Sequence, residues 1–391
     1  MKFLSQLEDP YNPLLGPTLK GLQIWGLWKP KWTHNLIHLS AFIFVIMQYI
    51  ELWIIRSNLE LALRNLSVTM LSTVCVVKAS TFVFWQKPWA EVIQYVTGLE
   101  KNQISKKDQN TNSIIAEYTK YSRKVTYFYW GLVAATVVTV ILAPLFSFMA
   151  GSNRTLIRNG SMSYSEIMSS WMPFNRTRGI GYWSTAIVHV LICFYGGGVV
   201  ANFDSNVIVL MFFFVGQLKL ISFNCSRLFG DGEAISYKAA LRRIRECHQH
   251  HVDLVKFSAI LNSLLSPVMF LYVIICSLMI CASALQLTTE CTSNMQRLWI
   301  AEYLMALIAQ LFLYCWHSND VLFMSNKVED GVYSSAWWSQ NIRIRRCVLL
   351  LGGQLRKQIV FTAGPFTQLT VATFVAILKG SYSYYTLLSK K

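Results

Sequence analysis

Seven apolar stretches are the feature that most constrains this chain of 391 residues. Crossing the hydrocarbon core of a bilayer takes about 20 residues of α-helix. Each stretch reaches about that length, and polar segments separate them: 36–55, 66–85, 126–149, 182–215, 258–286, 299–317 and 366–388. Their apolar residues recur in helical rather than alternating order, which excludes a membrane barrel. The sequence therefore predicts an all-α membrane protein with seven transmembrane helices.

The composition excludes several other classes of protein. Apolar residues make up 54% of the chain and charged residues only 14%, which does not fit a disordered chain, a secreted disulfide scaffold or an ordinary cytosolic enzyme. The net charge of +16 lies between the apolar stretches rather than in one domain, so no nucleic-acid partner is expected. Ser/His/Asp groups, Gly-rich phosphate loops and paired carboxylates at membrane depth are not recognisable. We expect neither an enzyme nor a cofactor.

The fourth stretch leaves two possibilities open, because polar and glycine residues interrupt it. It is either one long helix or two spans. With seven spans, the N-terminus and segments 86–124, 216–257 and 318–365 share one side and hold 24 Lys and Arg residues, against 9 on the other side. Splitting the fourth stretch would blur this asymmetry. Since basic loops stay in the cytoplasm, we expect one long fourth helix, a cytoplasmic N-terminus and an extracellular C-terminus.

Glycosylation sequons give an independent indication of this orientation. Four Asn-X-Ser/Thr sequons fall in the segments expected outside, at Asn65, Asn153, Asn159 and Asn175.

A G-protein-coupled receptor would have the opposite orientation, with its N-terminus outside. It usually also has a disulfide between outer loops, where only Cys291 lies here. A transporter or intramembrane enzyme would show charged residues deep in several spans. The candidates present are Lys78, Lys379, His189 and Asp204, with no complementary pairing evident. We expect Lys78 to reach cytoplasmic water.

The last third of the chain carries the most specific motifs. Residues 314–319 read Tyr-Cys-Trp-His-Ser-Asn near the inner end of the sixth span, and the chain closes with PFTQLTVATFVAILKGSYSYYTLLSKK. Over about residues 305–391 this combination resembles the C-terminal signature of insect odorant receptors. Gustatory receptors end differently, and the odorant receptor co-receptor has a long insertion between its fourth and fifth spans, where this chain has about 40 residues. The chain therefore resembles an odour-tuning subunit.

The resemblance implies a heteromeric, odorant-gated, non-selective cation channel. Such a subunit assembles with the odorant receptor co-receptor into a tetramer in the plasma membrane of olfactory sensory neurons, among membrane lipids, and binds a small volatile odorant. Four regions are then expected: a cytoplasmic segment at 1–35, six helices forming a ligand-binding bundle at 36–317, a cytoplasmic inter-subunit anchor at 318–365, and a pore-lining seventh helix with an extracellular tail at 366–391.

Two sets of residues are predicted to act within this architecture. On the seventh helix, Ser383, Leu387 and Lys391 share one face, where a ring of Leu387 could close a pore by dewetting; the alternative is a face buried against neighbouring helices. The family's pocket lies between the second, third, fourth and sixth spans. Helical spacing in their outer portions selects ten candidates: Ser72, Cys75, Val76, Ile141, Leu145, Tyr182, Ala186, His189, Tyr303 and Leu307.

The sharpest of these candidates are His189 and Tyr303, because a buried polar tip requires a partner. For every candidate, plain helix packing is the competing interpretation. A volatile of about ten heavy atoms would bind with about 6–8 kcal/mol, in the micromolar range or weaker.

Two further motifs have simple structural interpretations. Residues 247–251 read Cys-His-Gln-His-His but lack the second pair of a zinc site, so we expect a solvated cytoplasmic helix and no metal. The run Gly196-Gly197-Gly198 lacks the Lys-Ser/Thr that follows in a phosphate loop, and indicates close helix packing or a kink.

Overall fold

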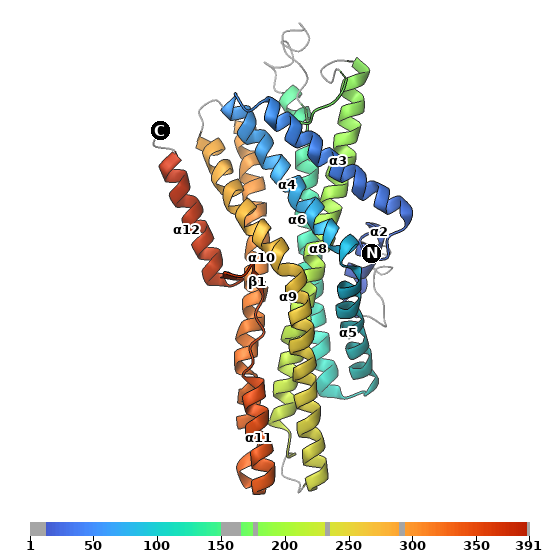
Figure 1. Cartoon of the computed structure of the whole chain (residues 1–391), viewed down its shortest axis with the longest axis vertical. Coiled ribbons are helices and arrows are strands. Elements are labelled where there is room, and N and C mark those ends of the chain that lie inside the picture. The colour runs from blue at the N-terminus through green and yellow to red at the C-terminus, as the bar shows by residue number, and fades with distance from the viewer. Residues whose placement is uncertain (1–12, 150–165, 175–178, 231–234, 289–293, 389–391) are drawn as a thin grey trace.

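The computed structural model is an elongated bundle of helices (Figure 1). It describes the chain except for residues 1–12, 150–165, 175–178, 231–234, 289–293 and 389–391, and a few side chains near helix ends. In chain order, the elements are α2 (Gly16–Ile24), α3 (Trp32–Ile54), α4 (Leu59–Phe84), α5 (Gln86–Ser105), α6 (Gln109–Met149), α8 (Gly179–Ser226), α9 (Tyr237–Thr288), α10 (Asn294–Tyr333), the short 3₁₀ helix η1 (Trp337–Ser339), α11 (Ile342–Leu355), β1 (Thr362–Ala363), β2 (Thr367–Gln368) and α12 (Val371–Leu388).

Six of the described helices are long and apolar enough to cross a membrane: α3, α4, α6, α8, α9 and α10. They coincide with the first six predicted spans. The seventh prediction, 366–388, corresponds to α12, which has 18 residues and begins only at Val371. The preceding residues form an antiparallel two-stranded hairpin instead, with Ala363 opposite Thr367. The all-helical prediction is confirmed in this coarse form.

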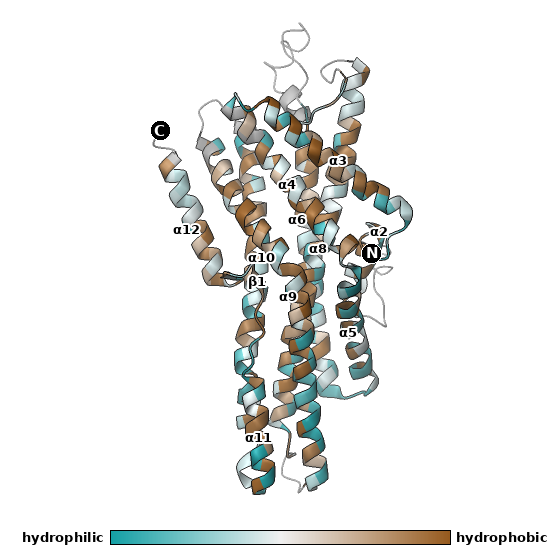
Figure 2. Ribbon diagram, in the orientation of Figure 1, coloured by the Kyte–Doolittle hydropathy of each residue, from teal (hydrophilic) through white to brown (hydrophobic). Residues whose placement is uncertain are grey.

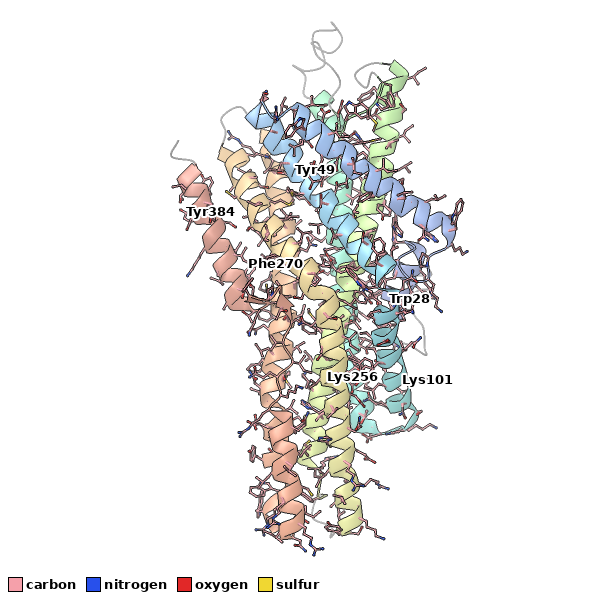
Figure 3. All side chains as sticks on the ribbon, viewed as in Figure 1. Trp28, Tyr49, Lys101, Lys256, Phe270 and Tyr384 are labelled. Atoms are coloured by element: carbon pink, nitrogen blue, oxygen red, sulfur yellow. The ribbon has the colours of Figure 1, made fainter. Side chains whose placement is uncertain are left out.

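The bundle has two halves of different polarity (Figure 2). The upper half of the view is largely hydrophobic, and we call it the apolar half. The lower half, the polar half, contains α5, α11 and the long extensions of α6, α8, α9 and α10 (Figure 1). Figure 3 shows Lys101 on α5 and Lys256 on α9 in this polar half. Most residues of the predicted connections 86–124, 216–257 and 318–365 are therefore helical and continue the bundle beyond the apolar half.

Helix α8 lies at the centre of the molecule. It runs without a break from Gly179 to Ser226, which confirms the prediction of one long fourth helix. It packs against α2, α4, α6, α9 and α10. Because it has neighbours on every side, its middle section is buried all round: residues 201–214 are all buried, including the polar Asn202, Asp204, Ser205 and Asn206.

The three consecutive glycines of α8 let two neighbours approach closely. A Cβ atom on Gly197 would lie 2.4 Å from Cγ2 of Val137 on α6, and one on Gly198 would lie 2.2 Å from the Trp25 indole. Real Cβ atoms essentially never come so close, so a larger residue at either position would force the Val137 or Trp25 side chain to shift. The predicted close packing is confirmed.

A tight turn at Gly364 redirects the chain from α11 into α12. Gly364 has φ of +68°, a left-handed conformation that glycine adopts without strain. Its N–H donates to the Ser266 carbonyl of α9 at 3.0 Å, and the Thr362 N–H donates to Asn262 Oδ1 at 2.9 Å. Phe270, labelled in Figure 3, lies against the same turn. The hairpin is thus fixed on α9, and α12 packs along α9 and α10 at one edge of the bundle.

A candidate ligand cavity above a buried ion pair

A cavity of about 140 Å³ lies inside the apolar half. Its walls come from α3, α4, α6, α8 and α10, together with Met168, and most of its lining residues are apolar. They are Ala41, Phe44, Val45, Leu71, Ser72, Cys75, Val76, Tyr129, Leu132, Val133, Thr136, Val137, Val140, Met168, Ile192, Cys193, Tyr195, Gly196, Gly197, Val200, Tyr303, Ala306, Leu307 and Gln310. A cavity of similar size in a protein core is known to bind benzene, so this one can hold a ring-sized molecule.

Half of the ten predicted ligand residues line this cavity, and the structure brings these five together: Ser72, Cys75, Val76, Tyr303 and Leu307. Ile141, Tyr182, Ala186 and His189 are not among its lining residues. The side chain of Leu145 lies outside the part that the structure describes. The lining positions of α6 and α8 are Tyr129 to Val140 and Ile192 to Val200, so on both helices the cavity lies deeper in the bundle than the predicted positions.

The two sharpest candidates have different surroundings. His189 is 1% exposed, and its Nε2 atom hydrogen-bonds the Ser170 hydroxyl at 2.9 Å. Its ring also packs edge-on against Phe44, which does line the cavity. The buried imidazole has therefore found its partner outside the cavity. The Tyr303 hydroxyl donates to the Met279 sulfur at 3.8 Å while its side chain lines the cavity.

Directly below the cavity lies a buried ion pair that we call, with its partners, the Asp204 cluster. Lys78 Nζ of α4 is 2.5 Å from Asp204 Oδ1 of α8, and both side chains are 0% exposed. The Tyr314 hydroxyl donates to the same oxygen. Tyr129 and Gln310 donate to Oδ2, each at 2.5 Å. The Asp204 cluster thus joins α4, α6, α8 and α10 through one carboxylate.

The Asp204 cluster corrects our expectation for Lys78. We predicted an ammonium group reaching cytoplasmic water and no complementary partner for either charge. The ammonium is instead buried among aromatic rings, with Nζ 5.5 Å from the Phe203 centroid, 5.1 Å from that of Tyr272 and 5.7 Å from that of Tyr314. An isolated charge in such surroundings would be very costly, so the pairing with Asp204 explains why both residues occur at membrane depth.

A second carboxylate, which the sequence did not single out, joins α6 to α10 beside the cavity. Glu302 accepts hydrogen bonds from the hydroxyls of Thr136 and Thr139, both at 3.0 Å. Thr136 is itself a lining residue. The spacing of the two threonines at i and i+3 was a usable signal, since it places both hydroxyls on one face of α6.

The predicted pore residues lie on the outer surface of the single chain. Ser383 and Leu387 are both exposed, with Leu387 at 69%, and the Ser383 hydroxyl donates to the Lys379 carbonyl at 3.0 Å. Lys379 is also exposed in the single chain, and Lys391 lies outside the described residues. Tyr384, labelled on the same helix in Figure 3, is 66% exposed. Much of the surface of α12 is therefore open to a partner.

The sequons and the Cys-His motif can be placed in part. Asn65 is 2% exposed on α4, where its side-chain oxygen accepts from Thr69 at 2.9 Å; Asn153, Asn159 and Asn175 lie outside the described residues. The helix around residues 247–251 is less solvated than predicted, because Cys247 and His251 are buried against the bundle. Among the described residues, no group of three or more His, Cys, Asp or Glu side chains could hold a metal ion.

Membrane-length helices around an apolar cavity define a multi-pass membrane protein. A family model described as 7tm Odorant receptor matches residues 58–382, and the chain therefore belongs to this family of insect odorant receptors. Its members are receptors, which confirms that the chain is not an enzyme.

Individual relatives agree with this assignment. Odorant receptor 82a of Drosophila melanogaster is 26% identical over 362 residues, which cover 90% of this chain and 91% of the relative. Odorant receptor Or2 of Anopheles gambiae is 29% identical over 147 residues, and that match spans only 39% of its length. The solved structure of the olfactory receptor OR5 from Machilis hrabei in complex with eugenol has a TM-score of 0.84 at 19% identity, covers 98% of this chain and shares its fold.

Proposed function

We propose that this chain is the odour-tuning subunit of a heteromeric, odorant-gated, non-selective cation channel. It assembles with the odorant receptor co-receptor in a tetramer in the plasma membrane of olfactory sensory neurons. The observation that carries the proposal is the apolar cavity inside the bundle, which has the size of a small volatile and is lined from helices that also hold the Asp204 cluster. Ligand sites of this kind are concave and mostly apolar, with few polar groups.

The surface of α12 supports the pore assignment. Leu387 and Ser383 are four residues apart, so they lie on one face of the helix, and both are exposed in the single chain. Four such helices around an axis would place Leu387 in a ring that can exclude water when closed. Exposed apolar side chains on α11, including Ile342, Leu349 and Leu350, support inter-subunit packing by the 318–365 segment.

The asymmetry of basic residues supports a cytoplasmic N-terminus and an extracellular C-terminus. The polar half of the bundle holds the segments rich in Lys and Arg, and this half would face the cytoplasm. The segment between α8 and α9 is short, from residue 227 to 236, which fits a tuning subunit rather than a co-receptor.

Electrical recording tests the proposal. Cells expressing this chain alone, the co-receptor alone, or both are exposed to a panel of volatiles. Cells that express both chains are called paired cells. The proposal predicts that only paired cells respond to the volatiles recognised by this chain, and that the response is a cation current that does not require second messengers. Tags on both termini of intact cells should show the C-terminus outside. A response carried by this chain alone through a second messenger, with an external N-terminus, would support a G-protein-coupled receptor instead.

A further inference from the structure

The Asp204 carboxylate is saturated with donors. Its two oxygens offer about four acceptor positions. Lys78 and Tyr314 donate to Oδ1, and Tyr129 and Gln310 donate to Oδ2. An ionised carboxylate accepts only, so each of the four partners must direct a hydrogen at it. This requirement also fixes the orientation of the Gln310 amide, whose nitrogen must face Asp204.

Two of these donors form the boundary between the Asp204 cluster and the cavity. Tyr129 and Gln310 are lining residues, whereas Lys78, Asp204 and Tyr314 are not. The inner end of the cavity is therefore formed by two polar side chains whose hydrogen-bonding roles the buried carboxylate has already set.

The hydrogen bonds to Asp204 leave Tyr129 and Gln310 with a defined set of donors and acceptors for a ligand. The single O–H of Tyr129 is donated to Asp204, so its oxygen is left as an acceptor only. Gln310 has given one N–H to Asp204 and retains one N–H and its carbonyl oxygen. A ligand hydroxyl can satisfy this set, because it donates to the Tyr129 oxygen and accepts from the Gln310 N–H. A carbonyl can only accept, and a hydrocarbon leaves every polar atom unmatched.

Polar groups elsewhere in the cavity are less suited to this role. The Thr136 hydroxyl donates within α6 or to Glu302, and the Tyr303 hydroxyl is directed at the Met279 sulfur. Most other lining residues are aliphatic or aromatic. Two further hydroxyls lie on the lining: that of Tyr195 is hydrogen-bonded to His38 at 2.6 Å, and that of Ser72 is a single group on α4. The cavity thus combines an apolar, ring-sized volume with a pair of polar side chains, Tyr129 and Gln310, at its inner end.

We propose that Tyr129 and Gln310 form a hydroxyl-recognition site at the inner end of the cavity, which tunes this chain to small aromatic alcohols and phenols. Lys78 and Asp204 are positioning residues, because they hold Tyr129 and Gln310 in these roles without lining the cavity. This inference rests on the proposed function and adds the chemical class of the ligand.

Matched ligands test this inference. Cells expressing the chain with the co-receptor are exposed to two sets of compounds. The first set is benzyl alcohol, benzaldehyde and toluene, and the second is 4-methylphenol and p-xylene. Within each set the ring scaffold is the same and only one substituent changes. We expect EC50 to be lowest for the hydroxyl compound of each set, by about tenfold relative to the hydrocarbon. Tyr129→Phe should raise EC50 for the hydroxyl compounds about three- to tenfold and leave that of the hydrocarbons unchanged. Gln310→Met should act in the same direction.

A control variant and cell-surface labelling separate recognition from folding. Tyr95→Phe removes a phenolic hydroxyl from α5 in the polar half, away from the cavity lining, and should preserve the ranking of ligands. The inference is overturned if hydrocarbons or aldehydes match the alcohols in the wild type, or if Tyr129→Phe at normal surface expression shifts all compounds equally. Silence toward every volatile in paired cells would instead overturn the proposed function.

Discussion

Lys78 Nζ lies 2.5 Å from Asp204 Oδ1, and both side chains are completely buried in the centre of the bundle. The two residues are 126 positions apart in sequence, on α4 and α8. Since Tyr129 and Gln310 attach α6 and α10 to the same carboxylate, this one pair fixes the mutual position of four helices just below the cavity.

Removing one member of this pair should be far more harmful than replacing both. Lys78→Met leaves a buried carboxylate without its cation and should lower the free energy of unfolding by about 3–5 kcal/mol. The double variant Lys78→Met, Asp204→Leu removes both charges and should lose less than the sum of the two single variants. Thermal unfolding of the detergent-solubilised chain measures all three. Strict additivity would show that the two charges do not interact.

Close packing of α8 on α10 leaves no room for a side chain at Gly331. A Cβ atom there would lie 2.2 Å from the Ser222 carbonyl oxygen, which is backbone and cannot rotate away. We expect Gly331→Ala to destabilise the chain by about 1–3 kcal/mol. Gly353→Ala is the matched control, because nothing lies within 4 Å of a Cβ atom at that helical position, and it should be neutral or stabilising by up to about 1 kcal/mol. Equal effects in thermal unfolding would contradict this packing.

We expect the stability of the chain to depend on pH through Glu100, a buried carboxyl group on α5 in the polar half. It is 1% exposed, accepts from the Leu14 N–H at 3.4 Å and the Tyr118 hydroxyl at 3.2 Å, and interacts with Arg123. Burial nevertheless raises the pKa of Glu100 from 4.5 to about 7, because these groups compensate only part of the lost hydration.

The chain should therefore lose stability as the pH rises from 4.5 to about 7. Between pH 4.5 and about 7 the folded chain keeps a proton that the unfolded chain has lost. The contribution of Glu100 to the free energy of unfolding is therefore largest below pH 4.5, and it decreases by about 3 kcal/mol as the pH rises to 7. Thermal unfolding at pH 5 and pH 8 measures this slope. Glu100→Gln should reduce it, and an unchanged slope in the variant would assign the pH dependence to other groups.

The exposed face of α12 leads to a prediction about the pore. Leu387→Ala should raise the resting current or alter ion permeability in cells that also express the co-receptor, because a smaller side chain weakens a dewetted constriction. Tyr382→Ala is the control, since Tyr382 is similarly exposed, at 67%, on a different face of the same helix. Unchanged currents with Leu387→Ala would remove this residue from the gate.

Much of the fold could be predicted because membrane-length apolar stretches and loop charge depend only on local sequence. The unbroken α8 and its close-packed glycines are examples. The extensions of α9 and α10 into the polar half could not be predicted from apolar stretches, because the helices there are amphipathic and are stabilised by tertiary contacts. The turn at Gly364 likewise depends on Phe270 and Ser266, which are distant in sequence.

The site was predicted less completely, for two physical reasons. Helical spacing shows which residues share a face, but it does not give the depth or rotation of one helix against its neighbours. His189 therefore faces Ser170, while Cys193 and Gly196 of the same helix line the cavity. The pairing of Lys78 with Asp204 is a contact between helices, and no periodicity within either helix encodes it.

If a volatile bound in this cavity opens the channel, as we propose, then filling the cavity should make the channel less sensitive to that volatile. Ala306→Leu adds three carbons to the α10 wall, whereas Ala309→Leu makes the same change one turn away on α10 at a residue that does not line the cavity. In paired cells with equal surface expression, we predict that Ala306→Leu raises EC50 at least tenfold for the volatiles that activate the wild type, and that Ala309→Leu leaves it unchanged. Equal EC50 values for both variants would show that the cavity is not the site at which these volatiles act.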